Sequence, residues 1–407
     1  MSRPPFGATL DLLGLSIPWY SLLMMAAVGI GIVLAMREER RLNLPKDTIL
    51  NFALWAIPLG VVGARLYYVA FNWGSFARNP LEILRVWNGG LAIYGAVIGG
   101  LLAALIATKG EKARLITLLD VCAPSLVLGQ AIGRWGNYAN MEAYGERLSD
   151  AGLQFFPLAV EIPVVGANGT AFWYWQMATF FYESIFCAAV FVILMALRKR
   201  TRRSGDVACW YVLLYGAART VIEGLRTDSL MINVSAAQVR ISQILSAVVC
   251  IAVVGIFYAR MPRKRRAPPA DAMAWAMAAV GIICTFVGEF ERNAYASLFT
   301  VAQGLLGALL ILDIIGIFHY ARHTRRFAAP GRALVVSAVL CAAMLALGLL
   351  LNERGAFYVP LRQALAMLHV VWAGAWFYLR GQVRTRKKVQ NAQPAPLPET
   401  PEEAEHV

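Results

Sequence analysis

The densest group of polar residues lies at positions 129–146, which read GQAIGRWGNYANMEAYGE. Its polar members are Gln130, Arg134, Asn137, Asn140 and Glu142. An arginine beside backbone amides that glycines leave accessible suits a lipid phosphate, and Gly133, Gly136 and Gly145 also allow unusual backbone shapes or close approaches. A solvated outer loop is the alternative interpretation. The apolar flanks, together with Trp135 and Tyr138, favour a position at or within the membrane interface.

A second group stands in the segment YGAARTVIEGLRTD, where Tyr215, Arg219 and Glu223 are spaced by four residues. On a helix this spacing stacks the three side chains on one face. The functional interpretation is an anion-binding Arg219 that is held in place by a carboxylate near the outer rim of a bilayer. A purely structural Arg219–Glu223 ion pair is the alternative. Arg226 and Asp228 follow near the same boundary.

Tyrosines form a third group of candidates. Tyr94 stands among the glycines of NGGLAIYGAVIGG, and Tyr20 follows Trp19. Tyr94 could donate a hydrogen bond or, if strongly perturbed, act as a base. Close helix packing explains such glycines equally well, and tyrosines are common in interfacial aromatic belts. Nucleophile-elbow, nucleotide-loop and zinc motifs are missing from the sequence, so it predicts no cofactor and no metal.

The composition shows which elements must carry these residues. Of 407 residues, 59% are hydrophobic and only 15% are charged, with a mean hydropathy of +0.57. These values exclude a disordered chain and favour a membrane protein. The six cysteines lie inside apolar runs and are interpreted as small buried hydrophobes. We expect an all-α polytopic membrane protein with spans at 16–36, 48–72, 89–108, 114–133, 172–197, 206–224, 236–259, 271–290, 294–318, 332–351 and 361–379.

The net charge of +14 reflects topology rather than nucleic-acid binding. Lysine and arginine gather in every second loop, at 37–46, 109–114, 198–203, 260–266, 322–332 and 380–388. This bias predicts an external N-terminus and a cytoplasmic C-terminus. Arg65, Arg240 and Arg362 fall within spans or at their ends, where they either snorkel or serve a function.

A basic, proline-rich break divides the chain. We expect a seven-span core at 1–260, a linker at 261–270, a four-span extension of unknown role at 271–390 and a disordered cytoplasmic tail at 391–407. Asp313 lies deepest among the acidic residues of the extension. It is interpreted as a polar contact that faces the bundle, with a functional role as the alternative.

The segment from Gly133 to Gly145 resembles the signature of prolipoprotein diacylglyceryl transferases, G-R-x-G-N-[FY]-x-N-x-E-x-x-G. Trp19-Tyr20, GARLYYVAF, GGLAIYGAVIGG and the Tyr215/Arg219/Glu223 triplet agree with that family in the same order, as does Asp120. The resemblance covers about residues 10–260. It implies seven spans, an external N-terminus and an active site towards the outer leaflet of a bacterial plasma membrane.

The resemblance also implies an activity. The family transfers the diacylglyceryl group of phosphatidylglycerol to the lipobox cysteine of a prolipoprotein signal peptide, forming a thioether and releasing glycerol phosphate, without a cofactor. It implies that Arg134 binds the lipid head group and that Arg219 supports the phosphate or the reacting centre. Asn137 and Glu142 would orient the head group and Arg134, and Glu223 would position Arg219. Tyr20 and Tyr215 would belong to the site, and Gly145 would permit the loop shape.

One position departs from part of the family. Many members carry histidine where Tyr94 stands, and that histidine has been cast as the base. Because tyrosine has an ordinary pKa of about 10, the role of Tyr94 stays open. A transporter for an anionic solute is the competing interpretation of the intramembrane charges. It requires a site near the midplane that is reachable from both faces, whereas Arg134, Glu142, Glu223 and Arg226 all lie towards the outer face.

Overall fold

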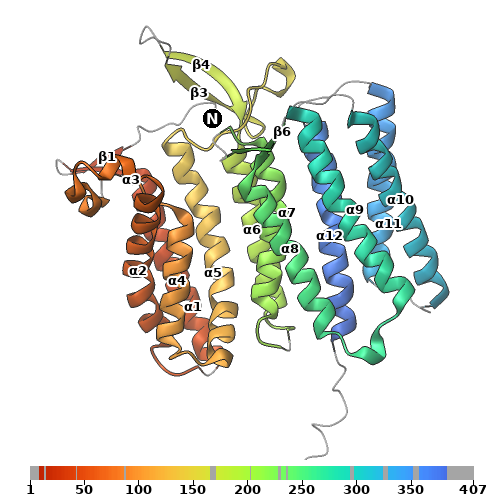
Figure 1. Ribbon diagram of the computed structural model, residues 1–407, viewed down its shortest axis with the longest axis horizontal. Helices are drawn as coiled ribbons and strands as arrows, with labels where there is room; N and C mark the ends of the chain where they lie inside the picture. The colour runs from red at the N-terminus through yellow and green to blue at the C-terminus, as the bar shows by residue number, and fades with distance from the viewer. Residues whose placement is uncertain are drawn as a thin grey trace, which may run out of the picture.

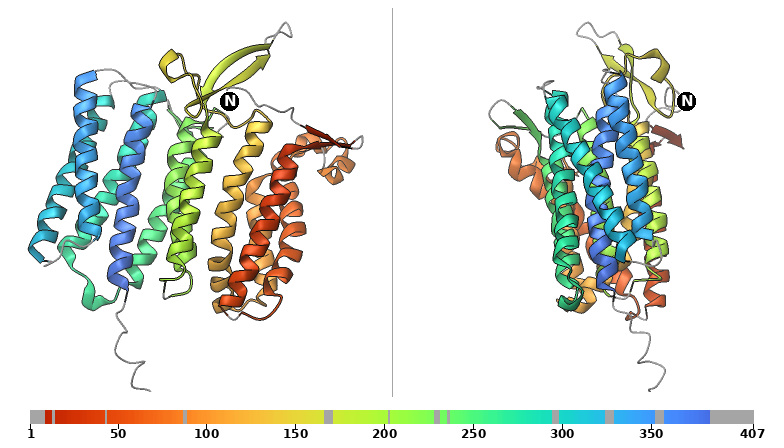
Figure 2. Two further views of the ribbon diagram at one scale, coloured as in Figure 1. Left: turned by 180° about the vertical axis from the view of Figure 1, so that it is seen from behind. Right: turned by 90° about the vertical axis from the view of Figure 1, so that its right-hand side faces the viewer.

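The computed structural model describes residues 9–12, 15–42, 44–86, 89–165, 171–201, 203–227, 231–234, 237–293, 298–323, 329–351 and 357–382. Long helices stand side by side in an upright slab that is wide in one view and thin in the perpendicular one (Figures 1 and 2). Between residues 9 and 260 they are α1 (Trp19–Arg41), α2 (Thr48–Phe71), α4 (Ile93–Ala107), α5 (Lys112–Ala139), α6 (Thr179–Leu197), α7 (Asp206–Leu225) and α8 (Ile241–Arg260). They are followed by α9 (Pro268–Asn293), α10 (Leu298–His323), α11 (Ala329–Leu351) and α12 (Tyr358–Gly381).

The remaining elements are short. They are the one-turn helix α3 (Trp73–Phe76), the 3-10 helices η1 (Pro80–Leu84), η3 (Ala151–Leu153) and η4 (Arg263–Arg265), and three antiparallel hairpins. The hairpins pair β1 (Thr9–Leu12) with β2 (Leu15–Pro18), β3 (Ala159–Val165) with β4 (Ala171–Met177), and β5 (Met231–Val234) with β6 (Ala237–Arg240). β1, β3, β4 and β6 all lie at one end of the slab (Figure 1).

The prediction of an all-α polytopic membrane protein is confirmed, and a helix overlaps each predicted span. Seven of the described helices are long and apolar enough to cross a bilayer: α1, α2, α5, α6, α8, α9 and α10. α4 and the apolar part of α11 are shorter. α7 and α12 carry buried ionisable residues, including Glu223 and Arg362, and both lie among other helices, where a membrane protein hides such groups from lipid.

Two predicted boundaries are wrong in a way that matters for function. The span predicted at 114–133 is too short, because α5 continues to Ala139 and carries Arg134 and Asn137 on a helix rather than in a loop. The span predicted at 172–197 begins too early, since β4 occupies Ala171–Met177 before α6 starts at Thr179. A short apolar run does not distinguish a strand from the start of a helix. In the same way, β2 and β6 occupy the first residues of the predicted spans 16–36 and 236–259.

Glycines set the packing of α2 against α4. A Cβ atom on Gly95 would overlap the carbonyl of Gly63, and one on Gly99 would overlap the carbonyl of Leu59. Small residues let two membrane helices approach at backbone distance. Close helix packing, one of the two interpretations offered above, therefore accounts for these glycines.

The four helices after residue 260 pack directly on those before it. One buried apolar cluster includes Trp210 and Leu213 of α7, Phe257 of α8 and Phe377 of α12. Arg240, at the end of β6, forms a buried ion pair with Glu289 of α9. The division at 261–270 stays a prediction about domains, and the tail at 391–407 lies outside the described residues.

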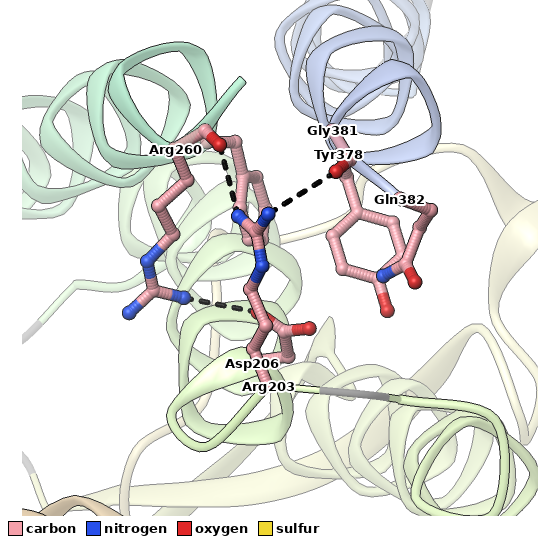
Figure 3. A pocket seen from close by; sticks show the side chains of 7 residues that line it. Arg203, Asp206, Arg260, Tyr378, Gly381 and Gln382 are labelled. Carbon is pink, nitrogen blue, oxygen red and sulfur yellow. Dashed lines mark hydrogen bonds and ion pairs between the residues drawn. The ribbon is translucent and has the colours of Figure 1, made fainter. Parts of the chain in front are cut away.

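A small pocket lies where α8 and α12 end, at the end of the slab away from the hairpins (Figure 1). Figure 3 shows the residues that line it. Arg203 reaches across it and donates to the carbonyl oxygens of Arg260, at 2.9 Å, and Gly381, at 3.4 Å. Arg260 in turn donates to Asp206 at 2.9 Å. The last residues of α8 and α12 are thus fastened to the start of α7.

Candidate active site

The polar residues of the signature lie where α5 ends, α6 begins and α7 approaches its end, beside the β3–β4 hairpin (Figure 1). Trp135 fixes α5 against α6, since its indole N–H donates to Ser184 Oγ at 3.1 Å. Ser184 Oγ donates back to the carbonyl of Ala131 at 2.8 Å. Tyr138 stacks on Phe180 with 4.7 Å between ring centroids. These contacts fix the distance between α5 and α6, from which Arg134 and Glu183 project.

A carboxylate on α6 joins the two candidate arginines. Glu183 accepts from Arg134 NH2 at 2.7 Å through Oε1 and from Arg219 NH1 at 3.2 Å through Oε2. The hydroxyl of Tyr215 also donates to Oε1, at 3.1 Å. The Glu183 side chain is only 3% exposed, whereas each arginine side chain is 18% exposed. A buried anion therefore aligns two cations that still reach the surface of the cluster.

Glu183 is not among the residues predicted from the sequence, because it stands alone in an otherwise apolar span. The available signal was the acidic residue itself, since a lone carboxylate in an apolar run is costly in a membrane unless it is paired. The predicted Arg219–Glu223 ion pair is present, and Tyr215, Arg219 and Glu223 share one face of α7 as their spacing predicts. The two arginines and two glutamates together are electrically balanced.

The residues after α5 extend the network towards the hairpin side. Arg134 NH1 donates to Asn137 Oδ1 at 3.3 Å, and Asn137 Nδ2 donates to Glu142 Oε1 at 2.9 Å. Asn140 Nδ2 reaches the same oxygen at 3.3 Å. The turn is made by Met141 and Ala143, which adopt positive φ values of 53° and 55°. Asn137 and Glu142 thus stand in one chain of hydrogen bonds with Arg134.

The signature glycines allow close packing, and Gly145 lies where the loop passes tightly against β4 and the end of α7. Gly145 donates to the Met177 carbonyl at 2.9 Å and forms a bridge with Arg226, and a Cβ atom there would lie 2.8 Å from Met177 Cβ. A Cβ atom on Gly136 would lie 2.5 Å from Tyr20 Cδ2. Tyr20 therefore enters the site region by packing on α5.

The arrangement has the chemistry of an anion receptor. A guanidinium carries five N–H donors, and the hydrogen bonds and ion pairs described here leave several of them on Arg134 and Arg219 for a ligand. Paired arginines bind phosphate oxygens in fork geometry, and their effect is strengthened where water is scarce.

The sequence profile of prolipoprotein diacylglyceryl transferases matches residues 8–259, more than half of the chain. The chain belongs to this family. The phosphatidylglycerol–prolipoprotein diacylglyceryl transferase of Streptococcus agalactiae is 41% identical over 250 residues, which cover 60% of this chain and 92% of that protein. The enzyme of that name from Enterococcus faecalis is 40% identical over 252 residues, covering 61% of this chain and 88% of that protein. The protein is therefore a membrane transferase.

The diacylglyceryl transferase match ends at the close of α8, so α9–α12 lie outside it.

Asp120, which agrees with the family pattern, lies far from the arginines along α5. It accepts from the backbone amides of Gly205, at 2.6 Å, and Ala208, at 2.8 Å. Its carboxylate thereby caps the start of α7, which later in its course carries Arg219.

Tyr94 and Arg65 contact neighbours other than the paired arginines of this transferase. Tyr94 lies in the first turn of α4 with its ring 6.0 Å from that of Tyr67, and among the described residues it makes no hydrogen bond to the cluster. Arg65 donates to backbone carbonyls of the η1 region, among them Ile83 at 3.0 Å and Gly89 at 2.7 Å. Arg65 therefore holds the loop that leads into α4.

Proposed function

We propose that this protein transfers the diacylglyceryl group of phosphatidylglycerol to the lipobox cysteine thiol of prolipoproteins. A bond forms between the cysteine sulfur and the terminal glyceryl carbon, and the bond between that carbon and the phosphate oxygen breaks. The thiol proton leaves with the phosphate, so the products are a thioether and glycerol phosphate. The reaction needs no oxidant, reductant or nucleotide.

The observation that carries this proposal is the pairing of Arg134 and Arg219 on Glu183. The phosphodiester is an anion, and its leaving oxygen gains further negative charge as the carbon–oxygen bond breaks. Two guanidinium groups held at fixed positions stabilise that charge without having to reorganise during the reaction. In the proposal Arg134 binds the head group and Arg219 supports the departing phosphate.

The neighbouring residues take positioning roles in this scheme. Asn137 and Glu142 orient Arg134 through their chain of hydrogen bonds, and Glu223 orients Arg219. Tyr215 fixes Glu183, and the gap that Gly136 leaves accommodates Tyr20. We assign Tyr94 to the site without a specific role, and its ring lies 6.0 Å from that of Tyr67 on α2.

The charge bias of the loops supports one orientation of the protein in the membrane. We propose a multi-pass protein of the bacterial plasma membrane with its N-terminus outside, its C-terminus in the cytoplasm and the active site towards the outer leaflet. Both substrates arrive within the bilayer, so a lateral opening between helices is expected to admit them. The transporter hypothesis requires a site at the midplane, whereas the paired arginines lie near one end of α5 and α7.

The test is transfer of labelled diacylglycerol from phosphatidylglycerol to a lipobox peptide by purified protein in detergent. The wild type is compared with Arg134→Ala and with Arg85→Ala, a matched control whose surface ion pair with Glu82 contributes little. We expect the wild type and Arg85→Ala to label the peptide cysteine and Arg134→Ala not to. A folded wild type that labels nothing would overturn the proposal.

A further inference from the structure

Three helices of the extension bring together an aspartate, a cysteine and a histidine. Asp313 of α10, Cys341 of α11 and His369 of α12 place one potential ligand atom each within 4.8 Å of one another. The Asp313–His369 distance is 3.2 Å between Oδ2 and Nε2, and Cys341 Sγ lies 4.0 Å from the same Oδ2. The three residues are between 0% and 1% exposed. The expectation that Asp313 faces the bundle is thus confirmed.

The histidine is oriented as a metal ligand is. Its Nδ1 lies 2.9 Å from the backbone carbonyl of Leu365, and because a carbonyl only accepts, Nδ1 carries the proton. In the neutral ring Nε2 therefore presents a lone pair towards Asp313. Ligating histidines usually donate their other ring nitrogen to a carbonyl or carboxylate in this way.

The aspartate supplies a second, independent observation. Within the described part of the chain, the other oxygen of Asp313, Oδ1, is buried and has no hydrogen-bond partner. Around the group lie buried apolar residues, including Cys284, Leu306 and Leu309. A carboxylate oxygen and an imidazole lone pair repel each other in such surroundings unless a proton or a cation lies between them.

We propose that Asp313, Cys341 and His369 form a binding site for a divalent transition-metal ion of the zinc type. Sulfur, imidazole and carboxylate ligands are the set that zinc accepts in tetrahedral sites. With bonds of about 2.0–2.3 Å, tetrahedral donor atoms stand about 3.3–3.6 Å apart. The two separations from Asp313 Oδ2, 3.2 Å to His369 Nε2 and 4.0 Å to Cys341 Sγ, lie close to that range. Ser337 Oγ lies 3.1 Å from His369 Nε2, so a hydroxyl group of α11 also borders the three ligands.

The site is separate from the proposed transferase chemistry and lies outside the family match. Cys341 and His369 fall near the middle of their helices, so a bound ion would join α10, α11 and α12 at mid-depth. The sequence alone predicted no metal, because the ligands come from three helices and follow no short motif. Binding would release the thiol proton of Cys341 and neutralise the Asp313 charge.

The experiment measures metal on the full-length protein in detergent, first by elemental analysis after growth with added zinc and then by titration with Zn²⁺. The variants are Cys341→Ser and His369→Gln, and the matched control is Cys250→Ser, which alters an equally buried cysteine of α8 outside this group. Every variant is checked for a monodisperse elution profile. Substitution with Co²⁺ adds a thiolate charge-transfer band that reports Cys341 directly.

We expect one zinc ion per chain in the wild type and in Cys250→Ser, with the ion and the cobalt band lost in Cys341→Ser. His369→Gln should weaken Zn²⁺ binding at least tenfold, in line with loss of a ligand. A wild type that takes up no stoichiometric Zn²⁺ overturns the proposal and leaves a hydrogen-bonded Asp313–His369 pair. Equal Zn²⁺ binding by the wild type and Cys341→Ser also overturns it.

Discussion

The sharpest prediction concerns Glu183, which the sequence did not single out. The change Glu183→Gln keeps the size of the side chain and removes its charge. One end of the glutamine still accepts from Arg134 or Arg219, but the other end presents an N–H₂ group to the second guanidinium. The two arginines then lose their common anchor, while Glu223 still pairs with Arg219.

The expected size of the effect follows from the two contacts that Glu183 makes with Arg134 and Arg219. At 2.7 Å and 3.2 Å from a carboxylate that is 3% exposed, both arginines belong to a buried ion-pair network. Removing one partner of a buried pair costs about 3–5 kcal/mol of unfolding free energy. A misplacement of about 1 Å at a reacting centre reduces turnover on the order of 100-fold. We therefore expect kcat to fall by about 100-fold, with KM for phosphatidylglycerol unchanged or lower because the arginines lose a competing anion.

Glu38→Gln is the matched control. Glu38 is also a buried carboxylate between two arginines, Arg41 and Arg198, with 2.6 Å to the latter, but it lies at the far end of α1. Both variants should lower the melting temperature in detergent. Only Glu183→Gln should lower kcat in the labelled-diacylglycerol assay.

Two results would refute this reasoning. If a folded Glu183→Gln protein keeps wild-type kcat, the bridging carboxylate does not align the arginines for reaction. If KM rises while kcat is unchanged, Glu183 serves lipid binding alone. A loss of kcat in Glu38→Gln equal to that in Glu183→Gln would assign the effect to general destabilisation.

Two further predictions concern the close packing at Gly136 and the buried ion pair between Arg240 and Glu289. Gly136→Ala should destabilise the protein by about 1–3 kcal/mol and impair transfer, because the added Cβ would meet Tyr20. Gly129→Ala on the same helix meets nothing within 4 Å, so it should lower neither the melting temperature nor the rate. Arg240→Gln and Glu289→Gln should each lower stability by about 3–5 kcal/mol, since each removes one partner of a buried ion pair. The double variant should recover much of that loss in thermal melts, and additive losses would contradict a direct pair.

The sequence predicted the helices well because a bilayer demands long apolar stretches. The length of such a stretch can be read from the sequence without knowing any tertiary contact. It failed at the ends of helices. α5 runs on through Arg134 and Asn137 because their polar side chains find partners on α6 and beyond the helix end, which composition cannot show. β4 was merged with α6 because its aromatic residues are as apolar as a span.

The sequence by itself determined the helix-face relation of Tyr215, Arg219 and Glu223, since a spacing of four residues fixes neighbours on any α-helix. It also determined the signature that identifies the family. Only the tertiary structure decided that Glu183 joins Arg134 to Arg219, and that Asp313, Cys341 and His369 meet. Those residues are far apart along the chain. The choice of helix neighbours depends on the shapes of whole helix surfaces and on small residues, as where Gly136 lets Tyr20 approach α5.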